Sequence, residues 1–469
     1  MGLSTIYQLI GVIVPLITAP YVSRVLGSSG VGINAFTASV LSYFTLFAGL
    51  GIQTYGNREI AYHQNDIKAR TKLFWELQIL QVLASLIAIL AFFIFLFFQN
   101  DNRFYYLLQA ISLLTVIANI SWFFMGLENF QIIVFRNILI NITVVIFTFI
   151  LVKNSEDLWI YIAMTTGASL LANLSVWPFL KRELTKVKFK ELNIHQHFVP
   201  ALTLLLPQIA TTAYMNINKT MLGWLDTNDS VGYFTQADVL VRTAFTAVSS
   251  FAGAFLPRLS NLFSQGKVKE GKKLILQSLQ LMYGMSFLAI SGIIGVSSNF
   301  AVFFFGEKFR SVGLLLVVES GVILLFGIAV VLRSQYLMAV RRMREITIAS
   351  VAALGVNILF NLPLIPLFGA LGATITVVFT EAMVTLYLVW AVRKDFLYRD
   401  LFHGIWKYIL AGAITTSVVW IINNNMNMSV IAYIVQAISG TLVYVLAVYL
   451  FQAPIVQLVK NAFYSRRKK

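Results

Sequence analysis

The sequence contains no cysteine, and only 12% of its 469 residues are charged. The absence of cysteine excludes a disulfide framework, a thiolate metal site and a cysteine nucleophile. About a quarter of the residues of a soluble domain are charged, so these few charges cannot cover the surface of a soluble chain of this length. Lipid must therefore be the solvent for much of the surface.

The features of a membrane enzyme are also lacking. The chain has no Gly-rich phosphate loop of the P-loop pattern, so ATP is not expected to drive it directly. The largest loop, 181–199, is too short for a catalytic domain. All four histidines fall in loops or near helix ends, and we expect neither a metal site nor a catalytic histidine. The first apolar run has no basic residue before it, which favours a retained helix over a signal peptide.

Hydrophobic residues make up 58% of the chain and recur in runs long enough to span a bilayer. These runs predict an all-α integral membrane protein with about fourteen transmembrane helices. The predicted spans are 3–23, 33–56, 73–98, 104–126, 131–152, 157–179, 200–223, 232–257, 274–296, 311–338, 345–367, 370–392, 405–422 and 429–451. The weakest separations are at Glu128–Asn129 and at Pro366–Gly369.

The formal net charge of +16 would favour nucleic acid as the partner of a soluble protein, but here the basic residues lie in short clusters between apolar runs. With the N-terminus placed inside, 26 of the 35 Lys and Arg residues fall in cytoplasmic segments and five in external ones. Lys and Arg are retained on the cytoplasmic side of membrane proteins. The distribution predicts an even number of spans, two cytoplasmic termini and no nucleic-acid partner.

Two stretches of the sequence match in order, which indicates an internal repeat. Pro15, Tyr21, Arg24, Leu26–Gly27 and Val31–Gly32 correspond to Pro207, Tyr214, Lys219, Leu222–Gly223 and Val231–Gly232. Six spans per half make the repeat parallel, as in two-lobed alternating-access transporters. We predict an N-terminal lobe at 1–180, a basic cytoplasmic linker at 181–199, a C-terminal lobe at 200–392, and a last pair of helices with a basic tail at 393–469.

Several of these segments resemble the polysaccharide-transport family of oligosaccharide flippases. They are PLITAPYVSRVLG at 15–27, GVG at 30–32, YGNREIA at 55–61, NKTMLG at 218–223 and LPRLS at 256–260. The family belongs to the MOP superfamily, with multidrug (MATE) exporters and the lipid II flippase. The chain departs from the lipid II branch at Val25, where an acidic residue would be expected after Arg24.

The resemblance implies a MOP-like fold of two six-helix lobes and two further helices. It also implies a transporter, not an enzyme, in the bacterial plasma membrane. Such a transporter turns undecaprenyl-pyrophosphate-linked oligosaccharide repeat units to the outer leaflet for surface polysaccharide biosynthesis. The partners implied are this lipid-linked oligosaccharide and the membrane lipids, with the glycan polymerase and glycosyltransferases of the pathway. The sugar structure and the oligomeric state are not specified by the sequence.

Charged residues within the spans are the candidate site residues, because a charge in the bilayer is costly unless it serves a function or is paired. Arg24 and Lys219 hold matched positions in the repeat, and with Arg242 they are candidate ligands of the pyrophosphate. Asp238 lies four residues before Arg242, so a structural ion pair is an open alternative.

Glu319 and Glu381 fall near helix centres. They are candidate coupling sites for H⁺ or Na⁺, or else structural acids. No cofactor and no metal are expected. A multidrug exporter is the nearest alternative function, although its cationic substrates would favour an acidic cavity. A membrane-embedded glycan polymerase or ligase is a further alternative, which would be expected to carry a sizeable external loop.

The topology is testable directly because the chain is free of cysteine. A cysteine placed at Gly266 or at Ser465 should be protected from a membrane-impermeant thiol reagent in intact cells and should react after permeabilisation. External labelling at either position would contradict the topology.

Overall fold

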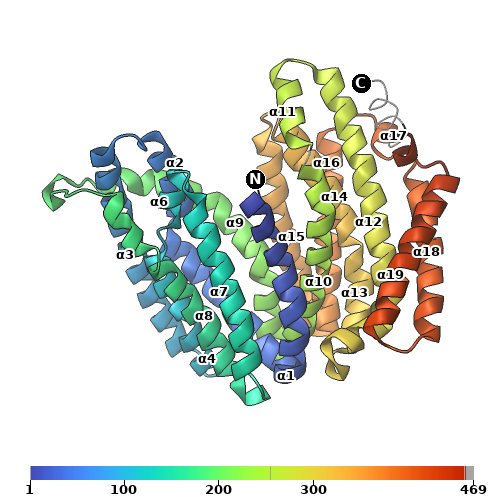
Figure 1. The fold of residues 1–469 in the computed structure, drawn as a ribbon, viewed down its shortest axis with the longest axis horizontal. Coiled ribbons are helices and arrows are strands. Elements are labelled where there is room, and N and C mark those ends of the chain that lie inside the picture. The colour runs from blue at the N-terminus through green and yellow to red at the C-terminus, as the bar shows by residue number, and fades with distance from the viewer. Residues whose placement is uncertain (1, 254, 459, 461–469) are drawn as a thin grey trace. The chain divides into compact units, whose positions relative to one another are not determined.

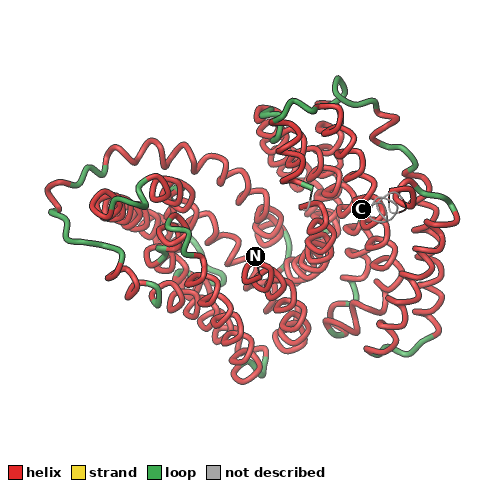
Figure 2. Tube along the Cα trace, turned by 45° about the horizontal axis from the view of Figure 1, so that its top comes forward, coloured by secondary structure: helices red, strands yellow, loops and turns green. Residues whose placement is uncertain are grey.

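The computed structural model describes residues 2–253, 255–458 and 460, and within these ranges every regular element is helical (Figures 1 and 2). The α-helices of the first half are α1 (Gly2–Gly49), α2 (Ile52–Tyr62), α3 (Ile67–Phe97), α4 (Arg103–Gln109), α5 (Ile111–Ala118), α6 (Ser121–Gly126), α7 (Phe130–Leu151), α8 (Leu158–Leu174) and α9 (His195–Leu225). Those of the second half are α10 (Asn228–Gly253), α11 (Leu256–Ser264), α12 (Val268–Phe305), α13 (Val312–Ser320), α14 (Val322–Val330), α15 (Met343–Phe368), α16 (Ala370–Ala391), α17 (Tyr398–Leu401), α18 (Ile405–Asn425) and α19 (Val430–Leu450). Short 3₁₀ turns are Ser155–Asp157, Trp177–Arg182, Phe189–Glu191 and Glu307–Phe309, and a π-helix runs over Val331–Leu337.

In the described part of the chain, twelve helical segments are long and apolar enough to cross a membrane. The first of them, Leu16–Tyr62, includes the predicted span 33–56 and the end of the predicted span 3–23, and α1 is kinked between the two at Gly27 (φ 70°, ψ −179°). A straight helix of 48 residues would measure roughly 72 Å, more than twice the hydrocarbon core of about 30 Å. Helix α10, at 26 residues, is long enough to span but more polar, and it corresponds to the predicted span 232–257. The chain is a multi-pass membrane protein, as predicted.

The two weakest predicted separations are real helix ends. Helix α6 ends at Gly126 and α7 begins at Phe130, with Glu128 between them at a φ of 59°. Helix α15 ends at Phe368 and α16 begins at Ala370, with Gly369 at a φ of 55°. A positive φ interrupts a right-handed helix, and glycine adopts it most readily.

The chain divides into two compact units, Met1–Gly232 and Tyr233–Lys469. The boundary between the units lies within α10, so the first unit includes all of α9. In the second unit, α18 and α19 pack against each other and α18 packs against α12. Tyr408 of α18 donates a hydrogen bond to Gln280 of α12 (3.0 Å). The lobe boundaries inferred from the repeat stay a prediction.

Two glycine residues allow α1 to cross the start of α10 at close range inside the first unit. A Cβ added to Gly32 would lie 1.7 Å from the carbonyl oxygen of Asn228, and one added to Gly232 would lie 2.2 Å from that of Ser28. The two contacts are reciprocal: Gly32 and Gly232 are 200 positions apart, and so are Ser28 and Asn228. Farther along α1, a Cβ on Gly223 of α9 would overlap the ring of Phe36. Small residues that let backbones approach closely are typical of helix contacts in membranes.

The stretch before α3 lies outside the spans and is held by a helix cap. The Asp66 carboxylate accepts hydrogen bonds from the backbone N–H groups of Ala69 (3.0 Å) and Lys68 (2.9 Å). These backbone donors favour the ionised carboxylate and lower the pKa of Asp66 below its ordinary value. The cap fixes where α3 begins.

Replacing Gly32 by Ala should destabilise the protein, because a methyl group there meets backbone that cannot move aside. Overpacking of this kind costs about 1–3 kcal/mol or more, so the melting temperature in detergent should fall. Gly167→Ala in α8 is the matched control, since a Cβ there meets nothing within 4 Å. Equal melting temperatures for the two variants would contradict the close crossing.

Candidate functional site

The helix pair α1 and α9 carries two of the predicted site residues, and both lie in the first unit. Arg24 is exposed on the part of α1 before the Gly27 kink, and Lys219 is partly exposed on α9. Hydroxyl groups join the two helices: the Ser39 and Thr220 oxygens lie 2.9 Å apart, and the Tyr43 hydroxyl lies 3.3 Å from Thr220. The compact unit that holds Arg24 also holds Lys219. The assignment of the two cations to different lobes of the repeat stays a prediction.

A cavity of about 320 Å³ opens between helices of the same unit. Seven of the ten residues that line it have a hydroxyl or amide group, and none is charged. The amides are Gln53 of α2, Gln81 of α3, Asn119 after α5 and Gln208 of α9, and the hydroxyls include Ser42 and Thr45 of α1. Small-molecule pockets measure about 300–1,000 Å³. The cavity is therefore large enough for one small polar group.

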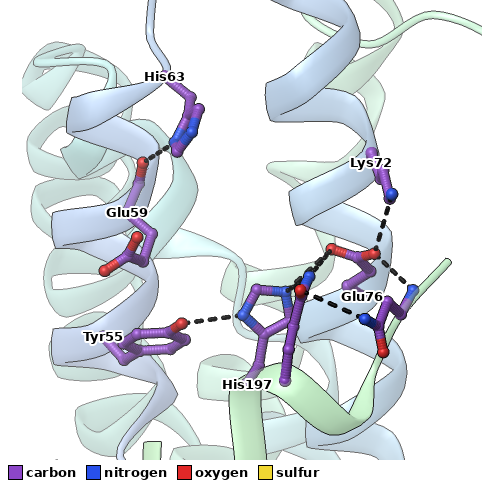
Figure 3. A network of polar contacts seen from close by, with 8 residues as sticks. Tyr55, Glu59, His63, Lys72, Glu76 and His197 are labelled. Carbon is purple, nitrogen blue, oxygen red and sulfur yellow. Dashed lines mark hydrogen bonds and ion pairs between the residues drawn. The ribbon is translucent and has the colours of Figure 1, made fainter. Parts of the chain in front are cut away.

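Three helices of the first unit meet at a buried polar network (Figure 3). His197, at the start of α9, lies between Tyr55 of α2 and Glu76 of α3, with its two ring nitrogens 2.9 Å from the tyrosine hydroxyl and 2.9 Å from the carboxylate. Glu76 also accepts the backbone N–H of Asn193 (2.6 Å). Because a carboxylate can only accept, the hydrogen bond between the ring and Glu76 is donated by Nε2–H of His197.

The network joins the helices α2 and α3 to the start of α9. It has no counterpart in the predicted site. His197 was expected near a helix end, where it lies, but its burial was not foreseen because its partners are 121 and 142 residues away. The sequence signal for this network is Glu76, an acid that closely follows the basic residues of the predicted loop before the span 73–98.

In the second unit, Asp238 and Arg242 of α10 form the ion pair that their i, i+4 spacing predicts. Asp238 is buried, and the Arg242 guanidinium lies 5.6 Å from the ring centre of Phe326. Arg242 compensates the charge of the buried Asp238 carboxylate, which supports a structural ion pair, the alternative to a role in binding the pyrophosphate. The Arg242 side chain stays 25% exposed in the pair.

Glu319 of α13 and Glu381 of α16 are both buried in the second unit, on helices that pack against each other. Beside Glu381, α16 buries the hydroxyl side chains of Thr380 and Thr385. Nowhere in the described ranges do three His, Cys, Asp or Glu residues come together as metal ligands. The arrangement can hold protonated or hydrogen-bonded acids inside the helix bundle.

The profile of the family described as "Polysaccharide biosynthesis protein" matches residues 1–263, more than half of the chain. The chain belongs to this family. Among curated relatives, the "Putative O-antigen transporter" of Escherichia coli (strain K12) is 24% identical over 390 residues, which cover 82% of this chain and 93% of that protein. The protein of the same name from Shigella dysenteriae is 25% identical over 387 residues, 81% of this chain and 96% of that protein.

Solved structures give the fold of this polysaccharide biosynthesis family member. The lipid II flippase MurJ in its inward closed conformation matches with a TM-score of 0.78 and 17% identity, covering 96% of this chain and 99% of that one. An inward-facing MATE multidrug transporter of the MOP superfamily matches with a TM-score of 0.64 and 15% identity, covering 81% and 95%. The MOP-like fold predicted from the sequence is confirmed.

The buried network around His197 should contribute to stability as a unit. His197→Ala removes a partner from the buried Glu76 carboxylate, which costs about 1–3 kcal/mol. The loss in the double variant with Glu76→Gln should be smaller than the sum of the single losses, because groups in one network couple by about 0.5–3 kcal/mol. Thermal unfolding in detergent measures all three. His63→Ala, at an exposed histidine whose ring bonds the backbone carbonyl of Glu59, is the control. Strictly additive losses at Glu76 and His197 would contradict the coupling.

Proposed function

We propose that the protein is a flippase for lipid-linked oligosaccharides. It moves undecaprenyl-pyrophosphate-linked repeat units from the cytoplasmic to the outer leaflet of the bacterial plasma membrane, for the synthesis of a surface polysaccharide. The family membership supports the pathway, since the matching family is one of polysaccharide biosynthesis. The names of the two curated relatives support a transported saccharide as the cargo.

The observation that carries the proposal is the polarity of the first unit. Its membrane-spanning helices hold two cations, Arg24 and Lys219, on α1 and α9, together with a cavity that is lined mostly by residues with hydroxyl or amide groups. Lipid offers no partner to such groups, so they favour a polar cargo that passes within the protein. A polyprenyl tail can stay in lipid, while the pyrophosphate and the sugars need this polar route.

The physical task of such a flippase needs no chemical step. The pyrophosphate would carry a large uncompensated charge in a medium of low dielectric constant, and cations reduce that cost. Transport then requires only two conformations of similar free energy, between which cargo and ions shift the populations. Alternating access between lobes, with both termini in the cytoplasm, belongs to this proposal.

Further parts of the proposal concern coupling and partners. Glu319 and Glu381 are proposed as the sites at which H⁺ or Na⁺ binding drives the cycle, with a structural role as the alternative. Arg242 is proposed as a third cation for the pyrophosphate, held in place by Asp238. The glycosyltransferases that build the cargo and the polymerase that consumes it are the proposed partners.

Charge at the two cation positions should matter more than donor geometry. Arg24→Lys and Lys219→Arg should retain most surface glycan, while Arg24→Ala and Lys219→Ala should each lose it by roughly ten- to a hundredfold, the loss expected for one hydrogen bond to a charged group, about 1.5–3 kcal/mol. The measurement is surface glycan per cell at equal protein expression, with lipid-linked intermediate accumulating inside. Arg103→Ala, at the exposed first residue of α4, is the control.

Two results would contradict the proposal at different levels. Normal glycan from a well-expressed Arg24→Ala, Lys219→Ala double variant would remove the assigned roles of the cations. Normal glycan after deletion of the gene, in a strain without a redundant transporter, would remove the function. Increased sensitivity to cationic drugs after deletion, with unchanged glycan, would favour the multidrug alternative.

A further inference from the structure

One membrane-spanning segment of the first unit is broken in its interior. The span Arg103–Gly126 is divided between α4, α5 and α6, and the break after α5 lies at Asn119, whose backbone is extended (φ −78°, ψ 103°). In a membrane, non-helical backbone is tolerated where it is buried in protein or lines a water-filled cavity. Broken helices of transporters are for this reason frequent at binding sites.

The backbone carbonyl groups at the end of α5, next to the break, have hydrogen-bond partners. Each of the last three carbonyl groups of α5 accepts a hydrogen bond from a side chain of another helix or turn. The donors are Gln81 to Val116 (2.5 Å), Gln78 to Ile117 (2.8 Å) and Trp177 to Ala118 (2.8 Å). The carbonyl groups at the C-terminal end of α5 therefore need no ligand as a hydrogen-bond partner. Polar atoms near the break that have no partner in the protein are available to a ligand.

Gln81 is the residue that connects this helix end to the cavity. Its amide nitrogen donates to the end of α5, the residue is 3% exposed, and its Oε1 has no hydrogen-bond partner. Gln81 lines the 320 Å³ cavity together with Val116 and Asn119 from the break. A buried acceptor without a partner costs about 1–3 kcal/mol. A ligand that donates a hydrogen bond to it would recover this cost.

We propose that this cavity is a saccharide subsite, which seats one sugar ring of the cargo. The inference rests on the proposed function and adds to it the part of the cargo that the cavity recognises. A sugar hydroxyl donates to Oε1 of Gln81, and other ring hydroxyls bond the hydroxyl of Thr212 and the amides of Asn119 and Gln208. Sugar hydroxyls both donate and accept, so they match a lining that mixes amides with hydroxyls.

The charge of the lining separates this subsite from the site of the pyrophosphate. None of the ten lining residues is a cation that would compensate a phosphate, or an acid that would attract a cationic drug. The cavity volume lies at the lower end for small-molecule pockets, which fits one ring and not a whole repeat unit. Recognition of the sugar and compensation of the charge thus fall to different residues.

The test compares the binding of two lipids to the purified full-length protein in detergent: undecaprenyl-pyrophosphate-linked N-acetylglucosamine and bare undecaprenyl pyrophosphate. The wild type should bind the sugar-bearing lipid more tightly. Gln81→Met, which keeps the side-chain length and removes both polar atoms, should weaken that binding roughly tenfold, as expected for one lost hydrogen bond. Its affinity for the bare lipid should stay the same. Thr212→Val, which removes only a hydroxyl, should act in the same direction.

Gln78→Met is the matched control. Gln78 lies on the same helix, caps the next carbonyl of α5 and is equally buried with an unpartnered Oε1, but it does not line the cavity. If Gln81→Met weakens binding only because it removes the hydrogen bond to the end of α5, Gln78→Met should weaken binding equally. Equal effects of Gln81→Met and Gln78→Met, or equal weakening of both lipids by Gln81→Met, would overturn the subsite.

The outcomes also separate the subsite from the function on which it rests. If the wild type binds both lipids with the same affinity, the subsite is wrong and the flippase proposal stands. If the wild type binds neither lipid, the proposed function fails with it. Inhibition by free N-acetylglucosamine at the same concentration as the lipid would show that the cavity takes free sugar, and would overturn its assignment to a lipid-linked cargo.

Discussion

Hydrogen-bond satisfaction in lipid is the constraint on which the rest of the structure depends. A polar group that faces hydrocarbon costs several kcal/mol, so each one must find a partner inside the protein or beside a polar cargo. The end of α5 shows how this is achieved, since three side chains cap its last three carbonyls. The same constraint explains the ion pair of Asp238 and Arg242 and the network around His197. Polar groups that keep unused hydrogen-bonding capacity are therefore informative about function.

Much of the fold could be predicted because it follows from the period and length of apolar runs. The helix ends at Glu128 and Gly369 were placed correctly, and the ion pair on α10 followed from its spacing of four residues. Helix interruptions inside a span were not predictable. The run 104–126 is apolar enough to be one span, and the break at Asn119 depends on capping residues from α3 and from the turn that begins at Trp177.

The candidate site was predictable where a charge stood alone in an apolar run, and not where the site is neutral. Arg24 and Lys219 stand out in the sequence because charge in a membrane span is rare. Gln81 does not, since an amide in a helix is more often a contact between helices. The packing of Gly223 of α9 against Phe36 of α1 lies within one compact unit, and the periodicity of the sequence does not report such a contact.

The central claim is that the saccharide of a lipid-linked cargo crosses the bilayer through this protein. It is tested most directly in vesicles that contain the purified protein and undecaprenyl-pyrophosphate-linked oligosaccharide with a fluorescent sugar. A membrane-impermeant quencher then reports the fraction of sugar in the outer leaflet. The account predicts that nearly all of the sugar becomes accessible over time. Accessibility that stays at the level of protein-free vesicles, with either H⁺ or Na⁺ gradients imposed, would contradict it.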